Sequence, residues 1–283
     1  MKTGNCIAVT GNVDKNFAEM KALGYETADV QLADTREPWY HDTAKMSTLC
    51  SQVRQTAEKY GIELFQIHGP WPTDDTTAAS RAEGWDYMHR SVYACHLLGA
   101  KYMVLHPQRP YSWREDEDPD FPETLTLALL QDLLPDCEKY DVTLCLENMP
   151  FRTQRLSTME RIAAVVEKAH SSHVGICLDT GHVNVFEGHD LGDAVRLASP
   201  YLKVLHVHDN DGTGDRHMLP YLGTANWDSF TTALAESGYD GPISMETQGP
   251  VSTKMPPHIQ QHAKQLTAMT ARYLADEVER KRK

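Results

Sequence analysis

Three histidines and several carboxylates lie close together between positions 202 and 217, in the stretch LKVLHVHDNDGTGDRH. A short apolar run leads into His206 and His208, which predicts a strand that ends there and is followed by a polar loop. Alternate side chains of a strand point to the same face, so these two histidines should share one side. The loop then adds Asp209, Asp211, Asp215 and His217. These residue types are typical metal ligands, and the alternative is a solvated turn.

The elements that position these residues alternate between strand and helix along the whole chain. Strands are expected at 5–10, 25–32, 62–68, 101–106, 142–147, 174–179, 202–208 and 242–246. Helical periodicity predicts helices near 14–23, 44–60, 78–98, 122–140, 157–170, 190–199, 226–237 and 257–280. Eight such alternations without a break in composition indicate an α/β protein, a single (β/α)8 TIM barrel domain over residues 1–283. An open doubly wound sheet is the main alternative, but no glycine-rich nucleotide-binding motif follows an early strand.

From the third expected strand to the eighth, each strand ends on a residue that could bind a metal ion. In chain order these residues are His68, His106, Glu147, Asp179, His206 with His208, and Glu246. The C-terminal ends of barrel strands meet at the face where active sites form. Carboxylates at the ends of apolar strands are costly to bury unless they are paired or metal-bound. We therefore predict that these side chains, with His182 at the mouth of the same loop as Asp179, converge on one metal centre.

Alternation within two of the strands supports this placement. In 142–147, Glu147 shares a face with the smaller side chains, and the large aliphatic residues occupy the other face. In 174–179, Asp179 shares a face with smaller residues in the same way. Large aliphatic side chains should pack against the helices, so both carboxylates are expected to point into the barrel.

The composition narrows the partners and the compartment. The formal net charge of −13 argues against a general nucleic-acid binder, because phosphate backbones are held by Lys and Arg. The sequence shows no apolar run of membrane-spanning length and no signal pattern at its start. Six scattered cysteines without a C-x-x-C motif indicate a reduced protein. We expect a cytoplasmic protein without a membrane partner, and a homo-oligomer is possible.

Several motifs resemble those of the xylose isomerase-like TIM barrel superfamily, which includes sugar and sugar-phosphate isomerases and epimerases and the AP endonuclease branch. They are LENMP, GICLDTGHVNV, HVHDNDGTGDRHMLPYLGTANWDSF and GYDGPISMET, and the resemblance is strongest from about 140 to 247. It implies that one divalent ion is held by Glu147, Asp179, His206 and Glu246. Such donors suit Mn²⁺, which we expect first, and also Mg²⁺, Co²⁺ or Zn²⁺.

The resemblance also implies a reaction. Glu147 and Glu246 would be the catalytic acid and base, moving a proton on a carbon next to a carbonyl or hydroxyl group through a cis-enediolate. The substrate would be a small sugar, keto-sugar or sugar derivative that contacts His182, and Arg216 and Trp113 are further candidates for binding it. We therefore expect a metal-dependent sugar isomerase or epimerase.

Three alternatives stay open. The AP endonuclease branch binds three zinc ions, and its additional ligands match His68, His106, His182, Asp215 and His217, while His208 is a further metal or substrate contact. The net charge and the acidic run WREDEDPD oppose binding of DNA. Other metal-dependent sugar chemistry, such as a lyase or hydrolase reaction on keto-glycosides, could use the same donors, and a carbohydrate-binding barrel without catalysis is the third possibility.

The second expected strand departs from the family pattern. Family members often carry Glu-Leu near its end, whereas this chain has ADVQL, with Asp29 and Gln31. This edge of the pocket often contacts the sugar, so the identity of the substrate stays open.

Overall fold

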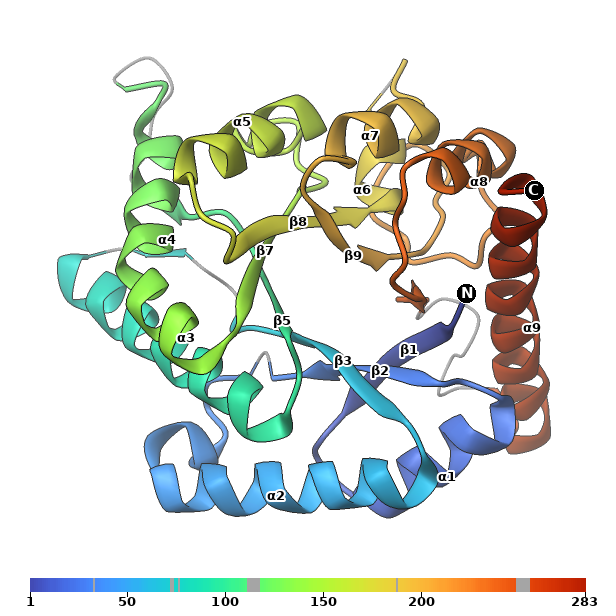
Figure 1. The fold of residues 1–283 in the computed structure, drawn as a ribbon, viewed down its shortest axis with the longest axis horizontal. Helices are drawn as coiled ribbons and strands as arrows, with labels where there is room; N and C mark the ends of the chain where they lie inside the picture. The colour runs from blue at the N-terminus through green and yellow to red at the C-terminus, as the bar shows by residue number, and fades with distance from the viewer. Residues whose placement is uncertain (33, 72–73, 76, 111–117, 187, 248–254) are drawn as a thin grey trace.

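The centre of the protein is an eight-stranded parallel sheet that closes on itself. The computed structural model describes residues 1–283 except 33, 72–73, 76, 111–117, 187 and 248–254. The strand order is β10-β1-β2-β3-β5-β7-β8-β9. The strands are β1 (Thr3–Ala8), β2 (Thr27–Gln31), β3 (Glu63–His68), β5 (Tyr102–Leu105), β7 (Thr143–Glu147), β8 (Val174–Asp179), β9 (Leu202–His206) and β10 (Ile243–Met245). A parallel bridge between Val207 and Met245 joins the two outer strands, which makes the sheet the predicted (β/α)8 barrel (Figure 1).

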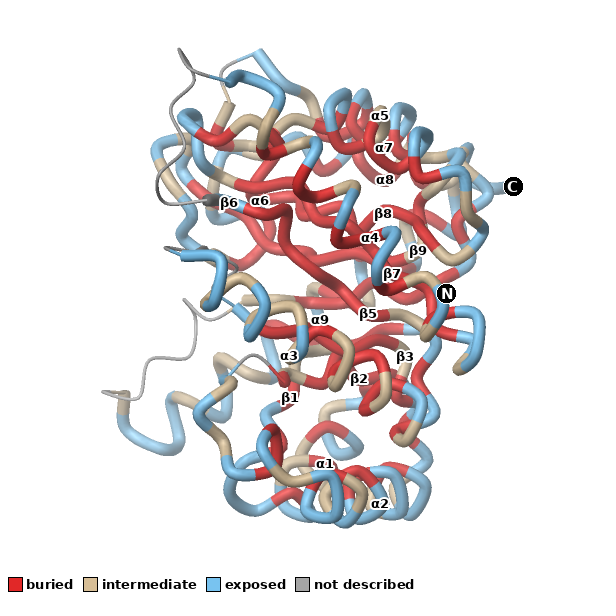
Figure 2. Tube along the Cα trace, turned by 90° about the vertical axis from the view of Figure 1, so that its left-hand side faces the viewer, coloured by how far each residue is buried: buried red, intermediate tan, exposed pale blue. Residues whose placement is uncertain are grey.

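Helices surround the barrel as an outer layer (Figure 1). They are α1 (Val13–Leu23), α2 (Thr43–Tyr60), α3 (Ala78–Leu98), α4 (Phe121–Tyr140), α5 (Met159–Ala169), α6 (Thr180–Asn184), α7 (Leu191–Ala198), α8 (Trp227–Glu236) and α9 (Pro257–Lys281), with a 3-10 helix, η1 (Pro38–His41). Figure 2 shows buried strands inside helices that alternate between buried and exposed positions, as amphipathic helices do. Within the described ranges, no helix is long and apolar enough to cross a membrane.

Short joints lead from α1, α2, α3, α4 and α5 back into the barrel, because each of these helices ends at a residue in the left-handed backbone conformation. Gly24 and Gly61 end α1 and α2 in the left-handed backbone conformation, with φ of 86° and 64°. Glycine adopts this conformation without the steric cost that a Cβ atom brings. The chain then enters the next strand within a few residues, and the longer loops gather at the C-terminal ends of the strands.

The strands bury side chains on both faces, as the alternation predicted. Leu144 and Leu146 belong to the main apolar core, which the barrel shares with the helices. A smaller cluster is formed by Val104, Cys145, Cys177 and Val204, with Phe65 and Tyr102 packed beside it. Cys145 and Cys177 lie on the same face of their strands as Glu147 and Asp179, so the two carboxylates end the inner face of β7 and β8.

Three local features differ from the predicted elements. The first strand is Thr3–Ala8 rather than 5–10, because its pairing with β2 ends at Ala8, whose carbonyl accepts a hydrogen bond from the Asn16 side chain. The short helix α6 was not predicted, and it begins directly after Asp179. A further two-stranded sheet, β4 (Asp74–Asp75) with β6 (Arg109–Pro110), joins the loops that follow β3 and β5.

Candidate metal centre and substrate pocket

Four side chains meet at the C-terminal end of the barrel. Glu147 ends β7, Asp179 ends β8, His206 ends β9, and Glu246 directly follows β10. Their potential ligand atoms all lie within 4.8 Å of one another. These strands are neighbours, in the order β7-β8-β9, with β10 bridged to the segment after β9. The closed barrel therefore brings together residues that are up to 99 positions apart in the sequence.

His206 lies among three carboxylates. Its Nδ1 is 2.8 Å from Glu147 Oε1, 3.3 Å from Glu246 Oε2 and 4.0 Å from Asp179 Oδ2. Glu147, Asp179 and His206 are all buried, and Glu246 is mostly so. Buried carboxylates in excess over their cationic partners are unfavourable without a further cation. Three carboxylates with one imidazole are donors that fit Mn²⁺, Mg²⁺, Co²⁺ or Zn²⁺, so the residues suit the divalent ion that the resemblance implies.

The second oxygen of Glu147 faces two histidines from the preceding part of the barrel. Glu147 Oε2 lies 3.1 Å from His106 Nε2 and 3.6 Å from His68 Nε2. The two imidazole rings meet edge to face, with centroids 4.9 Å apart. This oxygen has no well-directed hydrogen bond from any residue that the structure describes. His68, His106 and Glu147 therefore form a second group of potential ligands that shares Glu147 with the first.

The LDTGH motif folds Asp179 and His182 back onto each other. Asp179 Oδ1 accepts a hydrogen bond of 2.7 Å from the backbone N–H of His182 and so caps α6. Asp179 Oδ2 lies 3.0 Å from Nε2 of His208. The Asn148 backbone carbonyl accepts a hydrogen bond from His182 Nδ1, and the Asn148 amide pairs with the backbone of Asp179. The α6 turn thus holds His182 beside Asp179, and the segment after β9 brings His208 to the same carboxylate.

Asp215 and His217, from the GDRH segment, lie beside these histidines. Asp215 Oδ2 is 3.1 Å from His217 Nε2 and 3.5 Å from His182 Nε2. The rings of His208 and His217 stack, with centroids 4.1 Å apart. His217 Nδ1 donates a hydrogen bond of 2.8 Å to the backbone carbonyl of Glu246. The structure therefore brings all ten predicted or possible ligands into one connected cluster.

The two histidines beside Asp215 are protonated at neutral pH in the metal-free protein. Burial opposes their protonation, but Asp179 and other carboxylates raise the pKa of His182 to about 10. Contact with Asp215 likewise raises the pKa of His217 to about 9, and the same contacts lower the pKa of Asp215. These two imidazoles place positive charge at the pocket of a protein whose net charge is −13.

Neighbouring charges distinguish the two glutamates. Burial by itself raises the pKa of a carboxyl group, but His206 and His106 hold the pKa of Glu147 well below its ordinary value. Burial raises the pKa of Glu246, and the negative charges of Glu147 and Asp179 raise it further. Two carboxyl groups with opposite protonation preferences can divide acid and base roles between them.

A cavity of about 280 Å³ adjoins the cluster. It is lined by Gln31, His68, Trp71, His106, Glu147, Met149, Pro150, Phe151, His182, Asp215, His217 and Glu246. Both glutamates line it, whereas Asp179 and His206 do not. Trp71 and Phe151 are 54% and 40% exposed, so they leave aromatic surface free for a ligand. The cavity therefore combines polar groups that can orient a small molecule with an apolar wall.

One predicted substrate contact, Arg216, does not line this cavity, and another, Trp113, cannot be compared with it. Arg216 is exposed and contacts Asp211 and Thr213 instead. Trp113 lies outside the described residues. Among the described residues that line the cavity there is no Lys or Arg.

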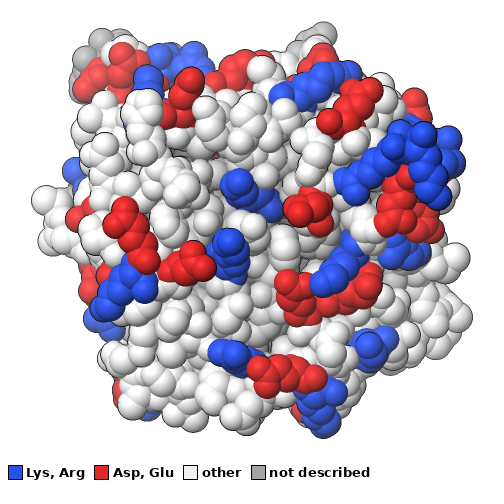
Figure 3. Space-filling model, viewed as in Figure 1, with Lys and Arg blue, Asp and Glu red and all other residues white. Residues whose placement is uncertain are grey.

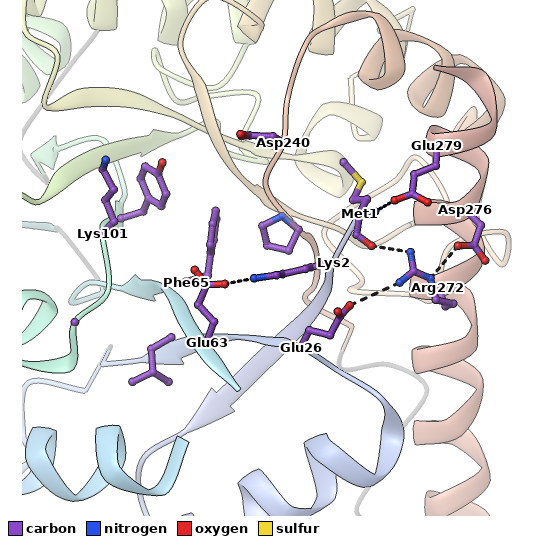
Figure 4. Close-up of a pocket in the computed structure, with 14 residues that line it drawn as sticks. Met1, Lys2, Glu26, Glu63, Phe65, Lys101, Asp240, Arg272, Asp276 and Glu279 are labelled. Carbon is purple, nitrogen blue, oxygen red and sulfur yellow. Dashed lines mark hydrogen bonds and ion pairs between the residues drawn. The ribbon is translucent and has the colours of Figure 1, made fainter. Parts of the chain in front are cut away.

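A larger cavity, of about 900 Å³, lies at the opposite end of the barrel, where the strands begin. Figure 4 shows Lys2 paired with Glu63, and Arg272 paired with Glu26 and Asp276. Figure 3, which is drawn from the same side as Figure 1, shows acidic and basic side chains intermixed over that face. Surface ion pairs of this kind neutralise each other, and active sites of TIM barrels form at the other end. We therefore place the functional site at the smaller cavity.

Three buried polar residues that support the site were given no role from the sequence, although Asp29 was noted as a departure from the family pattern. Asn148 holds the Asp179 loop, as described above. Asp29, from β2, and Gln66, from β3, lie inside the barrel, and Asp29 Oδ2 is 2.9 Å from His206 Nε2. A further signal for Asp29 and Gln66 is that both are polar residues within strand-like runs, where an inward-facing polar side chain needs a buried partner.

This chain is similar in sequence to sugar epimerases and to probable endonuclease 4 proteins, and similar in structure to solved epimerase-like proteins. D-psicose 3-epimerase from Enterocloster bolteae is 26% identical over 241 residues, which cover 82% of this chain and 75% of that protein. Probable endonuclease 4 from Mycoplasmopsis agalactiae is 22% identical over 224 residues, covering 72% and 78%. A solved D-tagatose 3-epimerase-like protein superimposes with a TM-score of 0.78 at 20% identity, covering 98% of this chain and 100% of that one.

The chain spans between 56% and 78% of the length of the curated relatives it matches. The profile of the family described as xylose isomerase-like TIM barrel matches residues 17–273, which is most of the sequence. This protein therefore belongs to the xylose isomerase-like TIM barrel family.

Proposed function

We propose that this protein is a metal-dependent isomerase or epimerase that acts on a small sugar, keto-sugar or related derivative. The observation that carries the proposal is the convergence of Glu147, Asp179, His206 and Glu246, of which only the two glutamates line the cavity. The similarity to D-psicose 3-epimerase supports a sugar substrate.

The four converging residues would hold the divalent ion, with Mn²⁺ as the first candidate. When bound, the ion would polarise adjacent oxygens of the substrate and stabilise the negative charge that develops on them. Asp179 and His206, which do not line the cavity, would serve only to hold the ion. Glu147 and Glu246 can in addition reach a substrate carbon.

The two glutamates would transfer the proton. One carboxylate removes the proton from a carbon next to a carbonyl group, which leaves a cis-enediolate, and the other carboxyl group returns a proton. Return to the opposite face of the same carbon inverts its configuration and is an epimerisation. Return to the neighbouring carbon, together with transfer of the hydroxyl proton from one oxygen to the other, moves the carbonyl group and is an isomerisation. Inversion needs a proton-transferring group on each face of the carbon, a role that the two glutamates of this cavity would fill, whereas a binding barrel needs neither.

Other residues of the cavity would orient the substrate. His182, protonated in the metal-free protein, can donate a hydrogen bond from Nε2 to a substrate oxygen that becomes negative. Trp71 and Phe151 would pack against C–H surfaces of the sugar and limit the access of water to the enediolate.

Exchange of substrate hydrogen with solvent deuterium tests this proposal. The Mn²⁺-loaded protein would be incubated in deuterated buffer with a panel of free ketoses, ketose phosphates and keto-glycosides. We expect deuterium at a carbon next to the carbonyl group of at least one sugar. Glu246→Gln, assayed at a Mn²⁺ concentration that saturates the variant, should slow the exchange by about 10²–10⁴-fold, the usual contribution of a general acid or base. Unchanged exchange in a metal-loaded Glu246→Gln protein would contradict the two-glutamate mechanism.

A trinuclear zinc nuclease is the second candidate, because the cluster contains further groups of potential ligands. These are His68, His106 and Glu147, then Asp179, His182 and His208, and then His208, His217 and Glu246. Metal analysis separates the two functions. One exchangeable Mn²⁺ per chain supports the epimerase, whereas three tightly held zinc ions with cleavage of abasic DNA would support the nuclease.

A further inference from the structure

The two ring nitrogens of His206 face different surroundings. Nδ1 is directed at the carboxylates of the metal-binding cluster, with Glu147 Oε1 at 2.8 Å. Nε2 is directed at Asp29 Oδ2, 2.9 Å away. Asp29 comes from β2, which does not supply any of the four proposed ligands. The Asp29 carboxylate therefore contacts the histidine from the side remote from the proposed ion.

Asp29 is held in place by the barrel itself. It is fully buried, and its pairing partner across the β2–β3 ladder is Gln66, next to a shift in register between the two strands. Gln66 Nε2 donates a hydrogen bond of 3.2 Å to Asp29 Oδ2, and the Cys6 thiol lies 3.8 Å from the same oxygen. A register shift redirects the side chains that follow it. The carboxylate is thus fixed by three strands before any ligand binds.

The chemistry of this contact determines which nitrogen of His206 carries the proton. A carboxylate accepts hydrogen bonds, so the contact with Asp29 requires a proton on Nε2. Nδ1 also faces a carboxylate, that of Glu147, so it carries a proton as well while no ion is bound. An ion at this carboxylate cluster replaces the proton on Nδ1, and the contact with Asp29 keeps the remaining proton on Nε2, so that the lone pair of Nδ1 is directed at the side of Glu147 and Glu246. Within the described part of the chain, His206 is the one basic group that pairs with Asp29. A carboxylate that accepts a hydrogen bond from one ring nitrogen while the other nitrogen faces the ion is the arrangement that orients histidine ligands in metal sites.

We propose that Asp29 is a positioning residue that holds His206 in the Nε2-protonated form and so presents Nδ1 to the divalent ion. The inference rests on the proposed function, because it assumes that His206 binds the ion. Its consequence is measurable without turnover. Loss of such a carboxylate partner weakens metal binding by roughly 10–100-fold.

Titration of Mn²⁺ into the metal-stripped full-length chain tests the assignment, with circular dichroism to show that each variant is folded. Asp29→Ala and Asp29→Asn are expected to raise the dissociation constant by roughly 10–100-fold. Cys6→Ala is the matched control, because Cys6 touches the same carboxylate oxygen but not His206. We expect its dissociation constant to stay within about twofold of the wild-type value.

A second measurement on the wild-type protein covers the case in which the Asp29 variants do not fold. Nuclear magnetic resonance of the Zn²⁺-loaded protein with ¹⁵N-labelled histidine should show His206 protonated at Nε2 and bound through Nδ1. Binding through Nε2 would overturn the assignment.

The remaining outcomes separate the two proposals. Folded Asp29 variants that bind Mn²⁺ as tightly as the wild type would overturn the role of Asp29 and leave the proposed function intact. A wild-type chain that binds no divalent ion would overturn the proposed function, and the assignment of Asp29 with it.

Discussion

Substitution of Gly181 by alanine should destabilise the protein, although the same change in most helices is stabilising. Gly181 lies in α6, and a Cβ atom there would stand 2.0 Å from Cε1 and 2.2 Å from Nδ1 of His208. Such distances are impossible, so the ring of His208 would have to move. That ring is fully buried, stacks on His217 and contacts Asp179 through Nε2. It cannot move without losing these contacts.

The size of the effect follows from three contributions. Alanine in place of glycine gains at most about 1 kcal/mol of helix propensity. Overpacking of a well-filled interior costs about 1–3 kcal/mol, and loss of the buried hydrogen bond between His208 and Asp179 costs about 1–3 kcal/mol more. The destabilising contributions are larger, so we expect Gly181→Ala to lower the free energy of unfolding by about 1–5 kcal/mol.

Gly84→Ala is the matched control, because Gly84 is also helical but a Cβ atom there would have nothing within 4 Å. This control should be more stable than the wild type by about 0.5–1 kcal/mol. Urea unfolding of the metal-free proteins measures both changes. A Gly181→Ala protein as stable as the Gly84→Ala control would refute the rigid packing that we assign to His208. Displacement of His208 from Asp179 should also weaken Mn²⁺ binding, and the control should not.

Three further predictions concern other parts of the molecule. Lys2→Met changes the cavity at the opposite end of the barrel and should leave Mn²⁺ binding and deuterium exchange unchanged. It should alter the free energy of unfolding by less than about 1 kcal/mol, because it removes a surface ion pair. Impaired exchange would indicate that the active site lies at that end of the barrel. Trp71→Ala should raise KM for the accepted sugar about fivefold with little change in kcat, because it removes roughly 1 kcal/mol of ring contact; an unchanged KM would exclude stacking. His89 is hydrogen-bonded between Asp136 and Asp132, and these contacts raise its pKa against the opposing effect of burial. The stability that these ion pairs contribute is therefore complete below the unfolded-state pKa of about 6.5 and is lost as the pH rises through the folded-state pKa. In urea unfolding, His89→Gln should be more destabilising at pH 5.5 than at pH 9, by up to about 1 kcal/mol. An equal effect at both pH values would contradict the ion pairs.

Much of the architecture could be predicted because strands and helices carry different apolar periods. The alternation in 142–147 predicted that Glu147 faces inward, and the structure confirms this. The end of the first strand was wrong by two residues, because the apolar run continues through Val9 whereas the ladder with β2 stops at Ala8. Local composition does not show where hydrogen bonding to a distant strand ends.

The candidate site was predictable only as a set of strand ends. That Glu147, Asp179, His206 and Glu246 would meet followed from the closure of a barrel, and their roles stay predictions. Asp29 could not be assigned, because its contact with His206 crosses the barrel between residues 177 positions apart. Contacts between side chains that face the same interior depend on strand register, and register is a property of the whole sheet.

Anomalous X-ray diffraction from crystals of the Mn²⁺-loaded protein, recorded near the manganese absorption edge, tests the central claim most directly. We predict one strong peak within coordination distance of Glu147, Asp179, Nδ1 of His206 and Glu246, at the end of the cavity that Trp71 and Phe151 line. A manganese peak away from these four residues, or bound to Nε2 of His206, would contradict the proposed metal centre.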